Sequence, residues 1–267
     1  MRLYWEFIKN TFQAELAYRT NTLLSFTGRI VTLLVQIAIW RAIMQNSGGS
    51  ATAGATVVTF EEMVTYSVVS AAISIFVTNE IIWIIDWKIR TGEIATDLIK
   101  PIDLRVQLLS RTIGGIGSDV FIQLVPTLLI GFIGFGLKLP TFQNGILFVI
   151  AVVNGLLISF AICYLLGLSG FWWNRVQQFN TVLRVSLRLF SGSFVPLWFF
   201  PKALADVAMI LPFRLIYFTA ISIYMGKLTS QEAIWQIMLQ FIWLAGFFLL
   251  ERLMWHRAIR RLVIQGG

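Results

Sequence analysis

Hydrophobic residues run along the chain in six long stretches that are separated by shorter polar segments. The apolar stretches cover residues 22–44, 64–85, 112–137, 145–171, 182–200 and 233–250. Each is close to the roughly 20 residues with which a helix crosses a hydrocarbon core of about 30 Å. None alternates like a barrel strand, and a backbone in lipid must satisfy its own hydrogen bonds, so helices are expected. The pattern predicts an all-α membrane protein with six transmembrane helices in a single domain.

A further apolar region, residues 203–225, is divided by Pro212 and Arg214 into pieces too short to cross a bilayer. Upstream, Gly192 begins the same pattern of helix breakers. Irregular backbone at membrane depth is tolerated where protein buries it or where it lines a watery cavity. We therefore expect a re-entrant hairpin over residues 201–225, before the last span. A kinked span with an interfacial loop is the alternative.

The first 19 residues mix apolar and charged positions at a helical period. Phe7 and Phe12 lie among charged residues such as Glu6, Lys9 and Glu15. This pattern predicts an amphipathic helix over residues 1–19 that lies in the membrane interface, with a solvated extension of the first span as the alternative. The same charges interrupt the apolar core that a cleavable signal peptide requires, so we expect the first span to be retained.

Lysines and arginines gather on alternate sides of the spans. The richer side has Arg2, Lys9, Arg19, Lys88, Arg90, Lys100, Arg105, Arg111, Arg175, Arg184, Arg188, Arg252, Arg257, Arg260 and Arg261. The other side has Lys138, Lys202, Arg214 and Lys227, and its first loop is small, rich in glycine and without basic residues. Because cytoplasmic loops carry the excess of positive charge, we expect both termini in the cytoplasm.

Composition excludes several other classes of protein. Hydrophobic residues make up 57% of the chain and charged residues 13%, which excludes a soluble domain. The net charge of +8 is explained by the cytoplasmic loops rather than by nucleic acid. With Cys163 alone in an apolar stretch and His256 as the one histidine, we expect no disulfide framework, metal site or redox centre. No phosphate loop of the form Gly-x-x-x-x-Gly-Lys-[Ser/Thr] is present, and no catalytic residue is expected.

The longest cytoplasmic connection, residues 86–103, has the strongest local pattern. Gly92 can end one helix and Pro101 another, which leaves a short helix over Glu93–Ile99 with Ile94, Leu98 and Ile99 on one face. A short amphipathic helix held outside the membrane is suited to a groove on a soluble partner. The alternative is a solvated linker whose apolar residues rest on the membrane surface.

Two charged residues fall inside predicted spans, Arg29 in the first and Asp119 in the third. Each lies about two helical turns from the cytoplasmic side, so the two could form an ion pair within the membrane. A gating or proton-transfer role, snorkelling and exposure to water are the alternatives.

Aromatic residues gather near the ends of the predicted spans, as in an interfacial belt. Trp198, Phe199 and Phe200 lie beside the expected hairpin, where they are candidates for an outer gate or for contact with an apolar substrate.

Small residues recur in the third and fourth spans. They are Gly114, Gly117, Gly131, Gly134, Gly155, Gly167 and Gly170. Glycines let helix backbones approach closely, which serves either an interface between two subunits or packing within one chain.

The segment Arg90 to Asp103, of the form R-x-G-x-I-x-x-D-L-I-x-P-I-D, resembles a stretch found in one bacterial subfamily of type 2 ATP-binding-cassette exporter permeases. The amphipathic start, the hairpin before the last span and the six-span topology are similar as well. The resemblance implies a complex of two permeases, identical or homologous, with two ATPase subunits in a bacterial inner membrane. It also implies that Glu93–Ile99 is the coupling helix, with Glu93, Ile94, Asp97, Leu98 and Ile99 as its contact residues. ATP and Mg would be held by the partner ATPase, and this chain would bind no cofactor.

The expected function is export of an amphipathic or apolar compound, with membrane lipid around the permease and no nucleic acid. An ion-coupled carrier or channel without an ATPase is the alternative, although that class favours more ionisable residues in the spans and an internal repeat. A membrane-embedded enzyme is a third, disfavoured by the lack of a His, Asp or Glu cluster. The sequence does not name the cargo.

Overall fold

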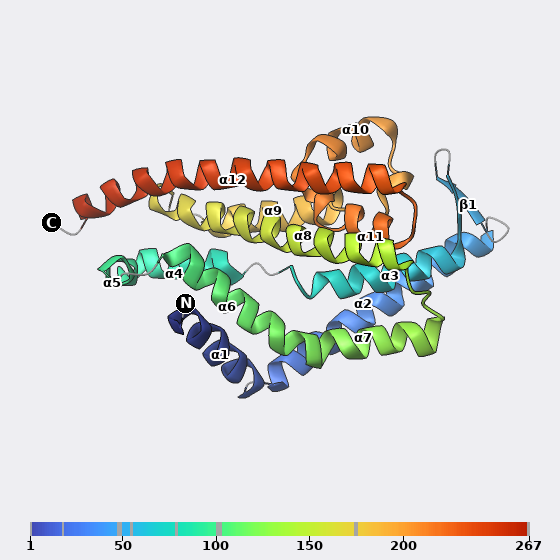
Figure 1. Cartoon of the computed structure of the whole chain (residues 1–267), viewed down its shortest axis with the longest axis horizontal. Helices are drawn as coiled ribbons and strands as arrows, with labels where there is room; N and C mark the ends of the chain where they lie inside the picture. Colours follow the sequence, from blue (N-terminus) through green and yellow to red (C-terminus); the bar gives the residue numbers. More distant parts are fainter. Residues whose placement is uncertain are drawn as a thin grey trace.

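The computed structural model of the chain is almost entirely helical (Figure 1). It describes residues 2–17, 19–46, 50–53, 56–77, 80–99, 103–173 and 176–265. A hairpin of two strands, β1 (Ser50–Ala53) and β2 (Thr56–Thr59), lies at one end of the molecule, which we call the hairpin end. The short helix α5 (Glu93–Ile99) and the last turns of α12 (Ser230–Gln265) lie at the opposite end, which we call the terminal end.

Within the described residues, four helical stretches are long and apolar enough to cross a membrane. They are Thr22–Gln45 within α2 (Arg19–Asn46), Leu104–Gly134, Phe142–Phe171, and Ser230–Arg260 within α12. Phe142–Phe171 joins α8 (Phe142–Leu168) to a short 3-10 turn, η3 (Ser169–Phe171). These stretches confirm apolar helices of spanning length at the first, third, fourth and sixth predicted spans.

The stretch Leu104–Gly134 is not a regular α-helix throughout. It passes through α6 (Leu104–Asp119), the π-helix η1 (Val120–Leu124), α7 (Val125–Leu129) and the π-helix η2 (Ile130–Gly134). Pro126 in α7 has no N–H to donate, and in a regular α-helix its ring would clash with the carbonyl four residues earlier. The wider π turn accommodates both effects. The helix bends between α6 and α7 (Figure 1), as helices do at prolines and π-bulges.

The second predicted span, residues 64–85, is two helices rather than one. α3 (Phe60–Ser74) ends before α4 (Glu80–Arg90) begins, and neither is long enough to count as a span by itself. In the sequence, polar residues interrupt the apolar run just before Glu80, and such side chains favour helix ends over helix interiors. The prediction of one continuous helix here was wrong.

The fifth predicted span, residues 182–200, is also discontinuous. α9 (Val176–Phe190) is followed by Gly192, which has a φ of +75° in the left-handed region that favours glycine. The backbone then continues irregularly to a short 3-10 turn, η4 (Leu197–Phe199). The expectation of a continuous helix was wrong because the helix-breaking residues in its second half outweigh its hydrophobicity.

The predicted hairpin region forms two helical pieces that bend by 75° at a break. α10 (Lys202–Ile210) is followed by the 3-10 turn η5 (Pro212–Leu215) and then by α11 (Phe218–Tyr224). The buried Arg214 side chain connects the parts: its Nε donates to the Met209 carbonyl at 3.0 Å and its Nη1 donates to Gln236 Oε1 at 2.7 Å. A cation at the last carbonyls of a helix is favoured by the helix dipole. The bent pair is therefore fastened both at its own corner and to α12.

The strand hairpin lies where the sequence predicted a small, glycine-rich outside loop, and α3 begins directly after it. Thr59 Oγ1 accepts from the Glu62 amide at 3.3 Å, and Glu62 Oε2 accepts from the Thr59 amide at 3.0 Å. This reciprocal pair is a capping box, which satisfies two backbone donors at the helix start. Glu62 also forms an ion pair with Lys227, so the start of α3 is joined to the turn before α12.

The predicted helix at the amino terminus is present as α1 (Arg2–Ala17), and it packs along α6. The contact is close because Gly114 faces the backbone of α1: a Cβ at this position would lie 2.5 Å from the Ile8 carbonyl oxygen. Two residues of the predicted range 1–19, Met1 and Tyr18, lie outside the described residues. Glycine in α6 therefore sets the distance between these two helices.

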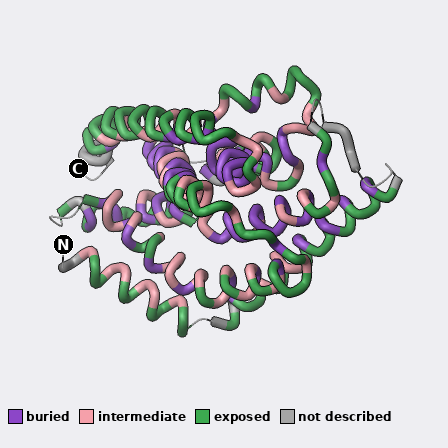
Figure 2. The backbone as a smooth tube through the Cα atoms, turned by 45° about the vertical axis from the view of Figure 1, so that its right-hand side comes forward, coloured by how far each residue is buried: buried purple, intermediate pink, exposed green. Residues whose placement is uncertain are grey.

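Other glycines of the predicted spans serve packing inside the chain as well. A Cβ at Gly131 would lie 2.6 Å from Val68, one at Gly155 would lie 3.0 Å from the Ile216 carbonyl oxygen, and one at Gly167 would lie 2.7 Å from Ile85. The largely buried helices α3 and α11 contact each other, and α11 also packs against α8; the buried parts of the chain lie toward the middle of the molecule (Figure 2). Of the two uses that the sequence left open for these glycines, packing within one chain is confirmed here.

Candidate functional site

The predicted coupling segment forms a sharp helical corner at the terminal end (Figure 1). The end of α4 is closed by the Thr91 amide, which donates to the Trp87 carbonyl at 2.9 Å. Gly92 has a φ of +74°, which a residue with a Cβ disfavours, and its carbonyl accepts from the Ala95 amide at 3.0 Å as α5 begins. Glycine at this position therefore lets the chain turn from α4 directly into α5.

A buried ion pair fastens α5 onto α4. Lys88 Nζ lies 2.5 Å from Asp97 Oδ2 and 3.4 Å from Glu93 Oε1. Lys88 is 7% exposed and Asp97 is 5% exposed, whereas the Glu93 side chain is half exposed. A buried charge that loses its partner costs several kcal/mol, about 3–5 in measured cases, so each residue requires the other. From the sequence, Lys88 was counted only among the basic residues that indicate membrane orientation, and its pairing across the Gly92 turn was missed.

The residues predicted to contact a partner divide into two groups. Ile94 is fully buried in the core of the chain, and Asp97 is engaged by Lys88. Ile99 is 84% exposed, and the side chain of Leu98 lies outside the described part of the structure. Trp87 in the last turns of α4 is 64% exposed and was not among the predicted residues. Among the side chains that the structure describes at this corner, Ile99 and Trp87 therefore offer exposed apolar surface.

At the other predicted site, side chains from two helices hold the irregular backbone that follows α9. The Tyr66 hydroxyl donates to the Gly192 carbonyl, Ser70 Oγ donates to the Ser193 carbonyl at 2.6 Å, and Gln36 Nε2 donates to the Phe194 carbonyl at 2.8 Å. Three consecutive carbonyls are thus satisfied by side chains of α2 and α3. This is what unwound backbone requires at membrane depth.

The three aromatic residues proposed as an outer gate follow this backbone and are partly buried. The Trp198 ring meets Tyr66 and Phe218 edge to face, with ring centroids 5.8 and 5.2 Å apart. Phe199 packs against Trp40 with centroids 5.2 Å apart, and Phe200 packs against the core. These contacts join α2, α3 and α11 around the break. The role of the three residues in gating stays a prediction.

Arg29 and Asp119, the predicted ion pair, each bind another side chain. Arg29 Nη1 donates to Ser74 Oγ at 2.8 Å, and Asp119 Oδ1 accepts from Gln123 Nε2 at 2.6 Å. Arg29 nonetheless lies close enough to act electrostatically on Asp119. A direct pair between them stays a prediction.

Glu15 of α1 lies close to this group. Burial raises the pKa of Glu15, and the like charges of Glu80 and Asp119 raise it further. Acidic residues of α1, α4 and α6, which are far apart in the sequence, therefore lie close enough to repel one another electrostatically.

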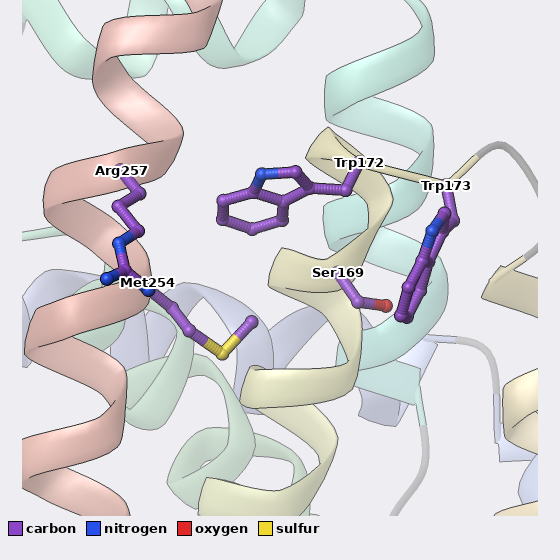
Figure 3. A pocket seen from close by; sticks show the side chains of 5 residues that line it. All are labelled: Ser169, Trp172, Trp173, Met254 and Arg257. Atoms are coloured by element: carbon purple, nitrogen blue, oxygen red, sulfur yellow. The ribbon is translucent and has the colours of Figure 1, made fainter.

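Two hollows open on the surface of the described residues. One, of about 540 Å³ toward the hairpin end, is lined by Ile37, Arg41, Met44, Gln45, Phe60 and Phe135. The other, of about 450 Å³ near the terminal end, is lined by Ser169, Trp172, Trp173, Met254 and Arg257 (Figure 3). Both are mainly apolar with a single arginine. Neither was predicted, because each joins residues from distant helices.

Among the described residues, no group of three or more His, Cys, Asp or Glu side chains could hold a metal ion. Four helical stretches of spanning length and apolar composition define a multi-pass helical membrane protein.

The family model described as ABC-2 family transporter protein matches residues 30–266, and the chain belongs to this family. It is thus the membrane-spanning, permease component of an ABC transporter, as the resemblance of the Arg90 to Asp103 segment predicted. A comparison with curated proteins found no match.

Proposed function

We propose that this chain is half of an ABC exporter and that separate ATPase subunits drive it by binding α5. The observation that carries the proposal is the corner at Gly92: α5 is locked to α4 by a buried ion pair and leaves Ile99 exposed. A helix that only linked two spans would not need a buried Lys88–Asp97 pair. A helix that receives force from a partner does, because it must not slide on α4.

A line of close contacts leads from α5 into the middle of the protein. α5 is fixed to α4 by Lys88, and α4 lies against α8 where Ile85 faces Gly167. α8 in turn lies against the bent region where Gly155 faces the Ile216 backbone. Helices that touch this closely move as a unit. Closure of two ATPase subunits on α5 would therefore tilt α4 and α8 together and move the outer bent pair.

The same proposal orients the protein in a bacterial inner membrane. Basic residues gather toward the terminal end, so this end and both termini face the cytoplasm. α1 lies in the inner interface. The broken α3–α4 pair and α9 supply the crossings that complete six, with α10 and α11 as the re-entrant hairpin. A second permease, identical or homologous, closes the translocation path.

The cargo proposed is an amphipathic or apolar compound that moves outward. Its exit passes the irregular backbone after α9, where Trp198, Phe199 and Phe200 form the outer gate. ATP and Mg are bound by the partner ATPase, in a site that this chain does not provide.

The first experiment is purification of the chain from its native membrane in mild detergent, with every stoichiometric partner identified. Ile99→Asp should lower recovery of the ATPase by about tenfold or more, because an unpaired carboxylate buried at an interface costs well over the 1.4 kcal/mol of one decade. Leu139→Asp is the matched control. Leu139 is a 75% exposed apolar residue in the loop before α8, away from the terminal end.

Full recovery of the ATPase with Ile99→Asp would remove α5 from the contact. Recovery of the wild-type chain without any ATPase would contradict the exporter and favour an ion-coupled carrier or channel.

A further inference from the structure

The hollow near the terminal end lies between two helices that are distant in sequence (Figure 3). Met254 and Arg257 project from α12 on one side. Trp172 and Trp173 follow η3 at the end of α8 and form the other side, with Ser169 at the base of the turn. The hollow has a volume of about 450 Å³, within the range of sites that hold small ligands.

Arg257 brings a positive charge to this hollow without a counter-ion. It forms no ion pair or hydrogen bond with any residue that the structure describes. The nearest carboxylate along α12, Glu251, is already occupied, because Arg105 Nη1 lies 3.4 Å from its Oε2. The charge of Arg257 is therefore available to an anion from outside the chain.

The other walls exclude a small hydrophilic anion as the natural occupant. Trp172 and Met254 are partly buried, and apart from the single indole N–H of Trp172 they offer apolar ring and thioether surface. Trp173 is 56% exposed at the end of a spanning stretch, the depth at which indole rings settle among lipid headgroups. A ligand that satisfies both the arginine and these walls must carry an anionic head and an apolar tail.

The position of the hollow along α12 indicates where such a ligand comes from. Before it, α12 exposes the apolar Leu249, Leu250 and Leu253, with one exposed cation, Arg252, that lies over the Phe248 ring; at the hollow and after it, the helix exposes Arg257 and Arg260. This change from apolar to basic surface marks the boundary between hydrocarbon and headgroups, and basic residues at that boundary attract anionic lipids.

We propose that this hollow binds an anionic phospholipid of the leaflet at the terminal end. The lipid phosphate pairs with Arg257, and the first part of the acyl chains lies against Trp172 and Met254. The site ties the end of α8 to α12 through a lipid. It does not depend on which cargo the protein moves or on the ATPase partner.

The proposal is tested by lipid binding rather than by transport. The purified chain is reconstituted in vesicles of equal parts phosphatidylglycerol and phosphatidylcholine, released in mild detergent, and the lipids that stay bound are identified by native mass spectrometry. Wild type should retain phosphatidylglycerol over phosphatidylcholine. Arg257→Gln should weaken that retention by about tenfold, the effect of losing about 1.4 kcal/mol, whereas Arg257→Lys should keep most of it.

Arg260→Gln is the matched control, because Arg260 is an exposed arginine on the same helix that does not line the hollow. Equal loss with Arg257→Gln and Arg260→Gln would show that only the overall basic charge matters and would overturn the site. Trp172→Ala should weaken retention of both lipids with Arg257 intact. If Arg257→Gln does not fold, unchanged lipid retention by Trp172→Ala overturns the proposal by itself.

Discussion

At the scale of single residues, the terminal corner depends on a charge pair that hydrophobicity patterns cannot reveal. Lys88 and Asp97 are both buried, although each belongs to a residue type that is normally exposed. Their pairing is readable in the sequence only once Gly92 is known to reverse the chain between them. The sequence therefore predicted α5 and its turn correctly, but assigned Asp97 to a partner although the structure uses it inside the chain.

Removal of one member of this pair should be much more damaging than removal of an exposed one. Asp97→Asn leaves a buried ammonium beside Glu93 alone, so the unfolding free energy should fall by about 3–5 kcal/mol. Lys138→Gln, which breaks the exposed pair with Glu61, should cost no more than about 1 kcal/mol. Thermal unfolding of the purified chain in detergent measures both. Similar losses in the two variants would mean that Lys88 is not buried in the membrane-extracted protein.

Glu15 should make stability depend on pH. Its pKa is raised in the folded chain by burial and by Glu80 and Asp119, with Arg29 nearby. The folded state therefore holds the proton more tightly, so the stabilising contribution is complete below the ordinary glutamate pKa of about 4.3 and is lost as pH rises through the raised value.

Glu15→Gln should thus match wild type at low pH and melt at a higher temperature at neutral pH. Melting curves across this range measure the difference, with Glu6→Gln, an exposed position on the same helix, as the control. A Glu15→Gln variant that tracks wild type at every pH would contradict the burial of this carboxyl.

At the scale of helices, hydrophobic length predicts continuity only where no side chain competes for the backbone. The predictions of the first, fourth and sixth spans succeeded because their apolar runs are unbroken. The third span contains Pro126, but a π turn accommodates the proline and the helix continues. The second and fifth failed as continuous helices, because average hydropathy conceals a few polar residues before Glu80 and the left-handed Gly192. The Tyr66 hydroxyl stabilises the irregular backbone at Gly192. Tyr66 is far from Gly192 in the sequence, so no local pattern predicts this hydrogen bond.

The close approach of α1 to α6 gives a test with neighbouring residues. Gly114→Ala would place a Cβ against the Ile8 carbonyl oxygen, so overpacking should cost about 1–3 kcal/mol. Gly115→Ala, with open space around its Cβ, should instead stabilise the helix by up to about 1 kcal/mol. Opposite shifts in melting temperature are expected, and equal shifts would show that α1 does not pack on α6.

At the scale of the whole molecule, the proposed mechanism depends on contacts that would carry movement between the two ends. The sequence located the ends, the helical corner and the bent region, but it did not show that α8 connects them. That connection arises from Gly155 and Gly167, whose importance is visible only when their partners on other helices are known.

A larger residue at the contact between α4 and α8 should uncouple the two ends. With Gly167→Val, the ATPase should still bind α5 and hydrolyse ATP, while transport in proteoliposomes should fall by about tenfold or more, since Ile85 must move away. Gly145→Ala in the same helix, where a Cβ has ordinary space, serves as the control. Loss of hydrolysis together with transport would mean that this contact supports assembly rather than transmission.

The length of α12 limits the shape of any soluble subunit. Its 36 residues rise about 54 Å, so about 24 Å of helix stands outside a hydrocarbon core of about 30 Å. This helix reaches the same end of the molecule as α5 (Figure 1). Its last turns carry the exposed Arg260, which lies beyond the proposed lipid site. In the proposed complex, a subunit that seats on α5 would present an acidic flank to the end of α12, and this feature would distinguish the cognate ATPase from its relatives.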